Sequence, residues 1–133
     1  MTRGDQLARF LADHWGRPYE LGTWDCILFV AAWADTLDGQ GHAARLRGTY
    51  GTEAAGLARL APHGINAAIT DDLGSCGWES VAPPYQVGDI ILTDLGHPGV
   101  WDGTRILAQP ARAAGVLQIH PRHAVSARRW PEN

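Results

Sequence analysis

Cys26 is the residue whose type and position most favour chemistry in this sequence. It follows a loop containing Gly and Thr and stands where an apolar segment begins. Unpaired N–H groups and the positive dipole end at a helix N-terminus stabilise a thiolate, and they can hold the oxyanion of an acyl-transfer intermediate. The position therefore favours a nucleophilic thiol. The competing interpretation is a small apolar side chain in the core, and the carboxylate of Asp25 opposes thiolate formation locally.

A nucleophilic thiol needs a base that is near in space, and six His are available. We choose His97, because it lies between a Gly and a Pro at the start of a predicted strand, where a rigid sheet would hold its ring against the helix. Gln109 follows twelve positions later. If the Asp102-Gly103 turn makes a hairpin, Gln109 lies on the neighbouring strand and can hold the imidazole.

The elements that must position these residues are two helices and a sheet. Helical spacing of apolar residues predicts a first amphipathic helix over residues 5–15, with Asp5 as its N-cap. A second helix over residues 24–37 is apolar on nearly every side, so it is central. The Ala- and Leu-rich middle of the chain, residues 41–77, predicts two or three short helices, such as 52–61 and 64–73.

The spacing of apolar residues changes at Val87, after which short β-like runs follow one another. They cover residues 90–92, 99–101, 105–108 and 115–119, and the tail from Ala127 adds a last short strand through Trp130. The predicted antiparallel sheet is thus built from residues 87–130. Helices first and a sheet second is the order of an α+β fold.

Length, charge and hydropathy limit the classes of function. The 133 residues suit one domain, residues 1–133. A net charge of −3, with eleven Arg and no Lys, lacks the basic excess of a nucleic-acid binder. No apolar run approaches the roughly 18 residues of a membrane span, and the start lacks a signal peptide, so we expect an unexported protein without a membrane span. Cys26 and Cys76 are expected to be reduced.

Four segments carry a family resemblance. Residues 16–22 resemble a G-x-P-Y-x-x-G loop, and residues 25–30 resemble a D-C-S-G-F-V nucleophile motif. Residues 88–90 are similar to a G-D-L strand start, and residues 97–101 to an H-V-G-I-Y strand. In this order they resemble the NlpC-type papain-like cysteine peptidases, which cleave stem peptides of bacterial cell walls. The resemblance covers residues 16–109.

The resemblance implies a papain-like fold and a role for each matching residue. Cys26 would be the nucleophile, His97 the general base and then acid, and Gln109 the residue that orients His97. Tyr19 would contact the oxyanion or the stem peptide, and we add Asp25 as a second substrate contact. The substrate would be a peptidoglycan stem peptide, with no metal or organic cofactor.

Divergent variants of this family occur among bacteriophage tail proteins. The resemblance therefore implies a virion tail component, made in the host cytoplasm, with other tail proteins as partners; outside that setting the protein would be cytoplasmic. Two departures from the motifs are notable. Ile27-Leu28 replaces the small Ser-Gly pair, and Pro98 removes a backbone donor from the His strand. They support an alternative, a non-catalytic structural or adaptor protein of a tail tip that retains the fold.

Three other sites are less favoured. His120 and His123 could form half of a zinc site, but there is no C-x-x-C pair, so we expect no metal. A glycan surface could use the six Trp, although those on or beside predicted helices are expected to pack in the core. A glycosidase could use paired acids; adjacent acids in a polar break are usually solvated. Those acids are Asp71 with Asp72, or Asp25 with Glu79.

Overall fold

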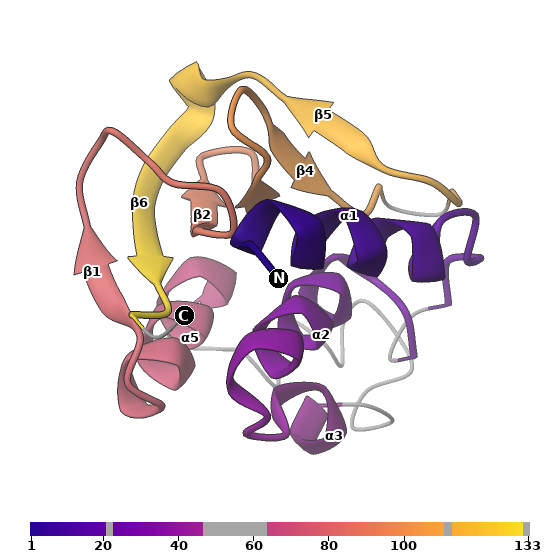
Figure 1. Ribbon diagram of the computed structural model, residues 1–133, viewed down its shortest axis with the longest axis horizontal. Helices are drawn as coiled ribbons and strands as arrows, with labels where there is room; N and C mark the ends of the chain where they lie inside the picture. The colour runs from indigo at the N-terminus through magenta and orange to yellow at the C-terminus, as the bar shows by residue number, and fades with distance from the viewer. Residues whose placement is uncertain (21–22, 47–63, 111–112, 132–133) are drawn as a thin grey trace.

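The computed structural model describes residues 1–20, 23–46, 64–110 and 113–131, and it has a mixed helix and sheet architecture (Figure 1). The helices are α1 (Arg3–His14), α2 (Cys26–Asp38), α3 (His42–Leu46) and α5 (Gly64–Ser75). The strands that follow are β1 (Glu79–Val81), β2 (Ile90–Thr93), β3 (Gly99–Trp101), β4 (Ile106–Ala108), β5 (Leu117–Ile119) and β6 (Ala124–Arg129), with a 3-10 turn, η1 (Pro121–His123), before β6. This order confirms the α+β class.

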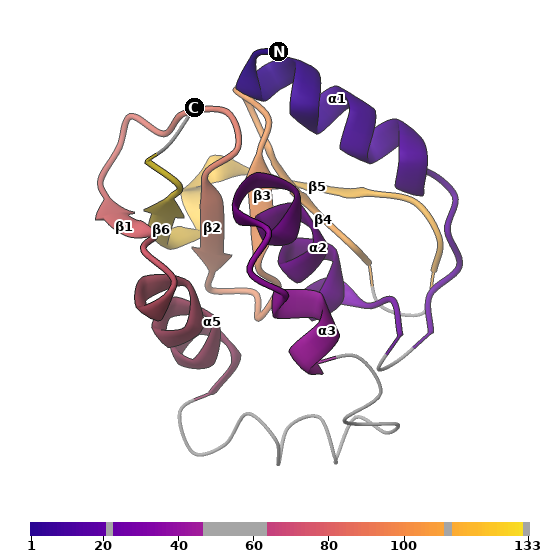
Figure 2. The same ribbon diagram turned by 60° about the horizontal axis from the view of Figure 1, so that its bottom comes forward.

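The strands form one antiparallel sheet in the order β1-β6-β2-β3-β4-β5. The C-terminal strand β6 therefore lies inside the sheet, between β1 and β2. Helix α2 packs against β3 and β4, α1 packs on α2, and α5 packs on β6. Figure 2 shows α2 in front of the sheet with α1 above it and α5 to one side. The helix that carries the thiol is thus held directly on β3 and β4, and the predicted base His97 precedes β3 while its predicted partner Gln109 follows β4.

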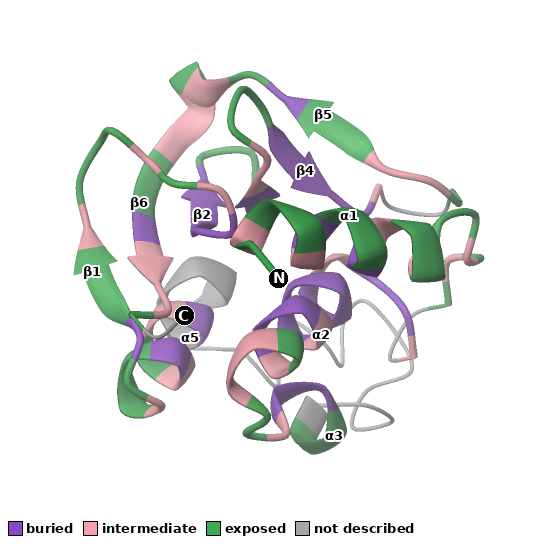
Figure 3. Cartoon of the chain, viewed as in Figure 1, coloured by how far each residue is buried: buried purple, intermediate pink, exposed green. Residues whose placement is uncertain are grey.

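The main core lies between the helices and one face of the sheet. In β2, Ile90 and Leu92 belong to this core, while Ile91 belongs to a second cluster with Ile106 and Ile119. This alternation is the period of two expected of a strand with both faces covered. Figure 3 shows α2, β2 and β4 buried over most of their length, whereas α1 is exposed on its outer side. The central position predicted for the second helix is confirmed.

Capping interactions explain where α1 begins and where α2 ends. Thr2, not Asp5, is the N-cap of α1: its hydroxyl accepts from the Asp5 amide while the Asp5 carboxylate accepts from the Thr2 amide. The predicted cap is therefore wrong, because this reciprocal capping box needs Asp5 at the third helical position. Helix α2 ends at Gly39, whose φ of 66° suits a residue without a Cβ.

Most predicted elements are found, with two differences in the sheet. β3, β4 and β5 fall within the predicted runs, β2 extends one residue beyond its predicted run to Thr93, and α5 matches the predicted helix 64–73. β6 begins at Ala124, three residues before the predicted tail strand, and β1 at Glu79 lies outside the predicted range 87–130. The predicted helix 52–61 lies outside the described residues. Within the described chain, no helix has the length and apolar character needed to cross a bilayer.

Candidate functional site

Cys26 is the first residue of α2, and Asp25 caps the helix. One oxygen of the Asp25 carboxylate accepts hydrogen bonds from the amides of Ile27 at 3.1 Å and Leu28 at 2.9 Å. Asp25 is only 2% exposed. The predicted role of Asp25 as a substrate contact therefore needs correction, because its side chain is enclosed and used by the helix cap. Two of the first three amides of α2 are taken by this cap.

The Cys26 thiol is half-buried and not in a disulfide. Burial, and after it the nearby Asp25 carboxylate, raise the pKa of the Cys26 thiol to about 11, although hydrogen bonds from the amides of Ile27 and Cys26 act in the opposite direction. We expected the helix dipole to stabilise a thiolate, and the shift is in the opposite direction. In the unliganded protein the thiol is therefore neutral near pH 7.

The bulky pair after Cys26 points into the core. Ile27 and Leu28 are 6% and 0% exposed. Ile27 joins the main core, and Leu28 packs with Ala31 and Ala43 in a small cluster of its own. Because both side chains are enclosed by protein, they do not present an apolar wall to solvent beside the thiol.

His97 lies in the turn between β2 and β3, where its backbone is fixed. The Thr93 hydroxyl donates to the His97 carbonyl at 2.6 Å and accepts from the Leu95 amide. The side chain is half-buried, and its Nδ1 atom is enclosed without a hydrogen-bond partner among the described residues. An enclosed ring nitrogen without a partner costs about 1–3 kcal/mol, so such atoms call for an explanation.

Gln109 follows β4 at the end of the sheet where β3 begins. Val100 pairs with Leu107 in the antiparallel register of β3 and β4. Continued by two residues, this register sets Pro98 opposite Gln109, so Gln109 and His97 stand at the same end of neighbouring strands. The hairpin predicted from Asp102-Gly103 is confirmed, because β3 and β4 pair across that turn.

The Gln109 amide is fully enclosed, and its contacts are with groups other than the imidazole. Its Oε1 accepts from the Trp24 indole at 3.1 Å, and its Nε2 donates to the carbonyls of Pro110 at 3.2 Å and Ala113 at 2.6 Å. Among the described residues these are its hydrogen bonds, so Gln109 does not orient the His97 ring directly.

Trp24 joins the start of α2 to the rest of this site. Its ring stacks on His14 with centroids 4.7 Å apart, and the Arg17 guanidinium lies 4.2 Å from the ring centroid. Its N–H binds Gln109, as described above. Since Cys26 follows two residues later, this bond holds the thiol segment at the end of the sheet where β3 begins.

Tyr19 is half-buried. The next residue, Glu20, forms an isolated antiparallel bridge with Trp24, two residues before Cys26. Tyr19 therefore lies on the segment that leads to the thiol. Its predicted role as a substrate contact stays a prediction.

The structure describes the surroundings of the other histidines and tryptophans that the sequence analysis considered. The Nδ1 atom of His120 accepts from the Arg122 amide, and that of His123 pairs with Asp94 at 2.9 Å, so the two rings are engaged separately. Trp24, Trp33 and Trp78 are packed in the core. Trp15 is the exposed Trp among the described residues.

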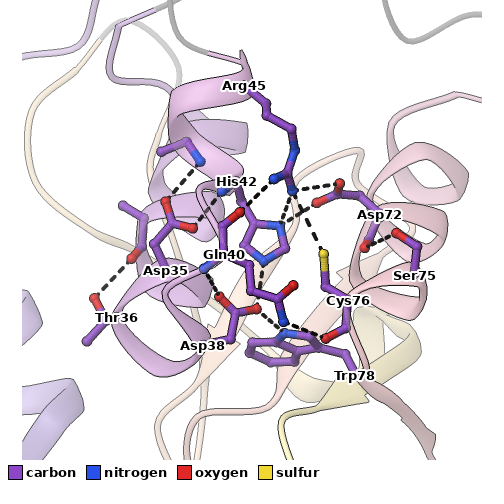
Figure 4. A network of polar contacts seen from close by, with 12 residues as sticks. Asp35, Thr36, Asp38, Gln40, His42, Arg45, Asp72, Ser75, Cys76 and Trp78 are labelled. Atoms are coloured by element: carbon purple, nitrogen blue, oxygen red, sulfur yellow. Dashed lines mark hydrogen bonds and ion pairs between the residues drawn. The ribbon is translucent and has the colours of Figure 1, made fainter.

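Sequence reasoning missed a buried polar network around His42, which joins α2, α3 and α5 (Figure 4). Asp38 lies 2.7 Å from Nε2 of His42, and Asp72 lies 2.5 Å from Nδ1. Arg45 contacts His42 and Asp72, and the Trp78 indole donates to Asp38 at 2.8 Å. Its members are spread over some forty positions of the chain, so no compact motif marks them.

Charge and burial compete at His42, which is 1% exposed. Burial alone would lower the pKa of His42, but hydrogen bonds to Asp72 and Asp38 outweigh it and raise that pKa. The hydrogen bond from His42 correspondingly lowers the pKa of Asp72. The network therefore gathers positive and negative groups in one enclosed place.

Fold and site together define an α+β protein with a half-buried thiol at a helix start and, in the turn before β3, an imidazole nitrogen without a partner among the described residues. The chain matches, over residues 2–129, the family described as a domain of unknown function (DUF6950). It therefore belongs to that family. No curated protein matches the chain.

Proposed function

We propose that the protein is a cysteine peptidase or amidase, with Cys26 as nucleophile and His97 as general base. The observation that carries this proposal is the enclosed Nδ1 atom of His97, which has no partner among the described residues. A structural His in this position would be expected to have its ring nitrogens paired. A base that accepts a proton from a thiol or passes it to a leaving group needs such a free nitrogen.

The reaction follows from these two groups. Nδ1 of His97 takes the proton of the Cys26 thiol as the sulfur bonds to the carbonyl carbon of an amide, and the carbonyl electron pair moves onto oxygen. Collapse of this intermediate breaks the C–N bond, and the imidazolium gives its proton to the departing amine. Water, deprotonated by the same nitrogen, then cleaves the thioester and restores the thiol.

The helix start supplies the oxyanion donor. Since the amides of Ile27 and Leu28 are held by Asp25, the Cys26 amide is the donor that the cap leaves over. A backbone amide aimed at the developing charge is the usual device of acyl transfer. The pKa of about 11 implies that proton transfer accompanies attack, rather than an ion pair waiting before substrate binds.

The substrate class rests on the resemblance to NlpC-type peptidases. A helix with the thiol packed against strands β3 and β4, with His97 before the first and Gln109 after the second, supports a papain-like arrangement. We therefore propose a peptidoglycan stem peptide as substrate. A bacteriophage tail that crosses the cell wall is the proposed setting.

A structural tail-tip adaptor is the second candidate, and two observations favour it. The Gln109 amide is bound to Trp24 and to backbone carbonyls. The raised pKa of Cys26 also describes a thiol that is stable in its neutral form. An adaptor would need the fold without the reaction.

Digestion of purified peptidoglycan separates the two candidates. We expect wild-type protein to release new amino groups from the stem peptides, and Cys26→Ala and His97→Gln to reduce the release to background while circular dichroism stays unchanged. Cys76→Ala is the matched thiol control and should keep full activity. Absence of release by the wild type, or equal release by Cys26→Ala, would favour the adaptor.

A further inference from the structure

We propose that His42, Asp72 and Cys76 form a binding site for a zinc-type divalent metal ion, separate from the proposed thiol site. The three residues come from the start of α3, from α5 and from the turn after α5 (Figure 4). One ligand atom from each lies within 4.8 Å of the other two. Nitrogen, carboxylate oxygen and thiolate sulfur together suit zinc better than magnesium or calcium, which prefer oxygen alone.

The second nitrogen of His42 is held as in known zinc sites. Nε2 lies 2.7 Å from the Asp38 carboxylate, whose side chain is fully enclosed. The same oxygen of Asp38 accepts from the Trp78 indole. A carboxylate behind a ligating imidazole keeps the proton on the far nitrogen and increases the basicity of the near one. This arrangement directs Nδ1 of His42 toward Asp72 and Cys76.

The contacts around Nδ1 are in conflict when no metal is bound. Nδ1 lies 2.5 Å from a carboxylate oxygen of Asp72 and 3.1 Å from Nη2 of Arg45. If Nδ1 carries a proton, it faces a second N–H group on Arg45. If it does not, its lone pair faces the carboxylate. One close contact is therefore uncompensated in either protonation state.

The Arg45 guanidinium lies where a metal ion would lie, but its planar shape fits the ligand atoms of His42, Asp72 and Cys76 poorly. Nη2 lies 3.1 Å from His42 Nδ1, 3.1 Å from the second oxygen of Asp72 and 3.9 Å from the sulfur of Cys76. This nitrogen has two hydrogens for three contacts, and a guanidinium binds best as a planar fork. A single metal ion would satisfy imidazole, carboxylate and thiolate together. The Arg45 side chain is 49% exposed, and its Nη1 atom donates to the Gln40 carbonyl at 2.6 Å, so Nη2 can then turn to solvent while that bond is kept.

The site has an opening to solvent. The Asp72 side chain is 39% exposed, while His42 is enclosed. A metal ion can therefore enter beside Asp72, and water can take the fourth position of a tetrahedral site. A network without metal, in which a protonated His42 bridges Asp38 and Asp72, is the competing explanation.

Cobalt titration of the purified, chelator-treated protein distinguishes the metal site from the network without metal. We use the Cys26→Ser background, in which Cys76 is the remaining thiol and the proposed peptidase is inactive, so this result does not depend on the proposed function. We expect one Co²⁺ per chain with a near-ultraviolet thiolate-to-cobalt band, displaced by Zn²⁺. Adding Cys76→Ser should abolish the band.

Two neighbouring acids make a matched pair of variants. Asp72→Asn should weaken Co²⁺ binding strongly, and Asp38→Asn by about 10- to 100-fold. Asp71→Asn, at an exposed neighbour of Asp72, should leave the affinity unchanged. Absence of the band, its survival in the Cys76→Ser variant, or equal effects of Asp71→Asn and Asp72→Asn would overturn the site.

Discussion

The indole N–H of Trp24 donates to the amide oxygen of Gln109 at 3.1 Å, and both side chains are buried. Trp24 stands two residues before Cys26, and Gln109 follows the strand that pairs with β3. One hydrogen bond therefore ties the start of the thiol helix to the end of the sheet from which His97 emerges. It does so across 85 positions of sequence.

Trp24→Phe should test this link. An aromatic ring is kept, but the enclosed Gln109 oxygen loses its indole partner and the smaller phenyl leaves a gap in the core, so we expect a loss of at least about 1–3 kcal/mol in the free energy of unfolding. Urea denaturation followed by circular dichroism measures it. Trp15→Phe, at a side chain 68% exposed, should change stability by less than about 0.5 kcal/mol. Equal values for the two variants would contradict the link.

The site was predictable where a single residue and its place in the chain decided the matter. The apolar run and the Gly39 stop located Cys26 at a helix start, and the short runs after Val87 located His97 just before a strand. The partner of Gln109 was not predictable, because nothing in the spacing distinguishes a bond to an imidazole from one to the Trp24 indole. Which side chain hydrogen-bonds to a buried amide depends on how the folded protein packs.

The Cys26 thiol should react only at high pH. With Cys76→Ser removing the other thiol, we expect the rate of iodoacetamide labelling to rise through alkaline pH with a midpoint near pH 11, where half of the Cys26 thiol is ionised. The raised folded-state pKa also means that forming the thiolate opposes folding, so stability falls as pH rises from about 9 toward 11.

The contribution of the Asp25 carboxylate to the raised pKa of Cys26 can be separated from that of burial. Asp25→Asn keeps a good helix cap but removes the negative charge, so the midpoint of the labelling profile should move to lower pH. Asp13→Asn, on the exposed side of α1, is the charge-matched control and should leave it in place. A labelling midpoint near pH 7 for Cys26 with Asp25 in place would contradict a neutral, half-buried thiol.

Gly99→Ala should destabilise the sheet beside His97. A Cβ at Gly99 would lie 2.5 Å from Ile106 Cγ2 and 2.6 Å from the Leu107 carbonyl oxygen, and the backbone atom cannot easily move away. We expect a loss of about 1–3 kcal/mol, measured by thermal or urea unfolding. Gly4→Ala in α1 meets only the Thr2 hydroxyl at 3.8 Å and should instead be neutral or stabilising. Equal losses would argue against the close approach of β3 and β4.

The fold was less predictable for the neighbouring strands β1 and β6. β1 has the burial pattern exposed, exposed, intermediate, so its three residues carry no apolar alternation. β6 contains Ser126, Arg128 and Arg129 and lies inside the sheet, where the Arg129 head group reaches Asp89. Such strands form because a neighbour offers backbone partners, and this cannot be read from their own side chains.

Arg129→Met should show how much this ion pair matters. Two nitrogens of Arg129 bind the two oxygens of Asp89 at 2.8 Å each, and Asp89 is 1% exposed. The variant removes both hydrogen bonds and the nearest positive charge from an enclosed carboxylate and leaves it the weaker field of Arg3, so we expect a loss of about 3 kcal/mol in urea unfolding. Arg105→Met, at an exposed turn residue, should cost less than about 0.5 kcal/mol. A loss no larger than this control would contradict the ion pair.

The most direct test of the proposed chemistry is covalent capture of the thiol by a stem-peptide analogue with a chloromethyl ketone in place of the scissile amide. Peptide mapping by mass spectrometry should find the adduct on Cys26, with Cys76 unmodified and labelling at least tenfold slower in His97→Gln. Equal labelling of the two thiols, or labelling of Cys26 that is indifferent to His97, would contradict a Cys26 nucleophile served by His97.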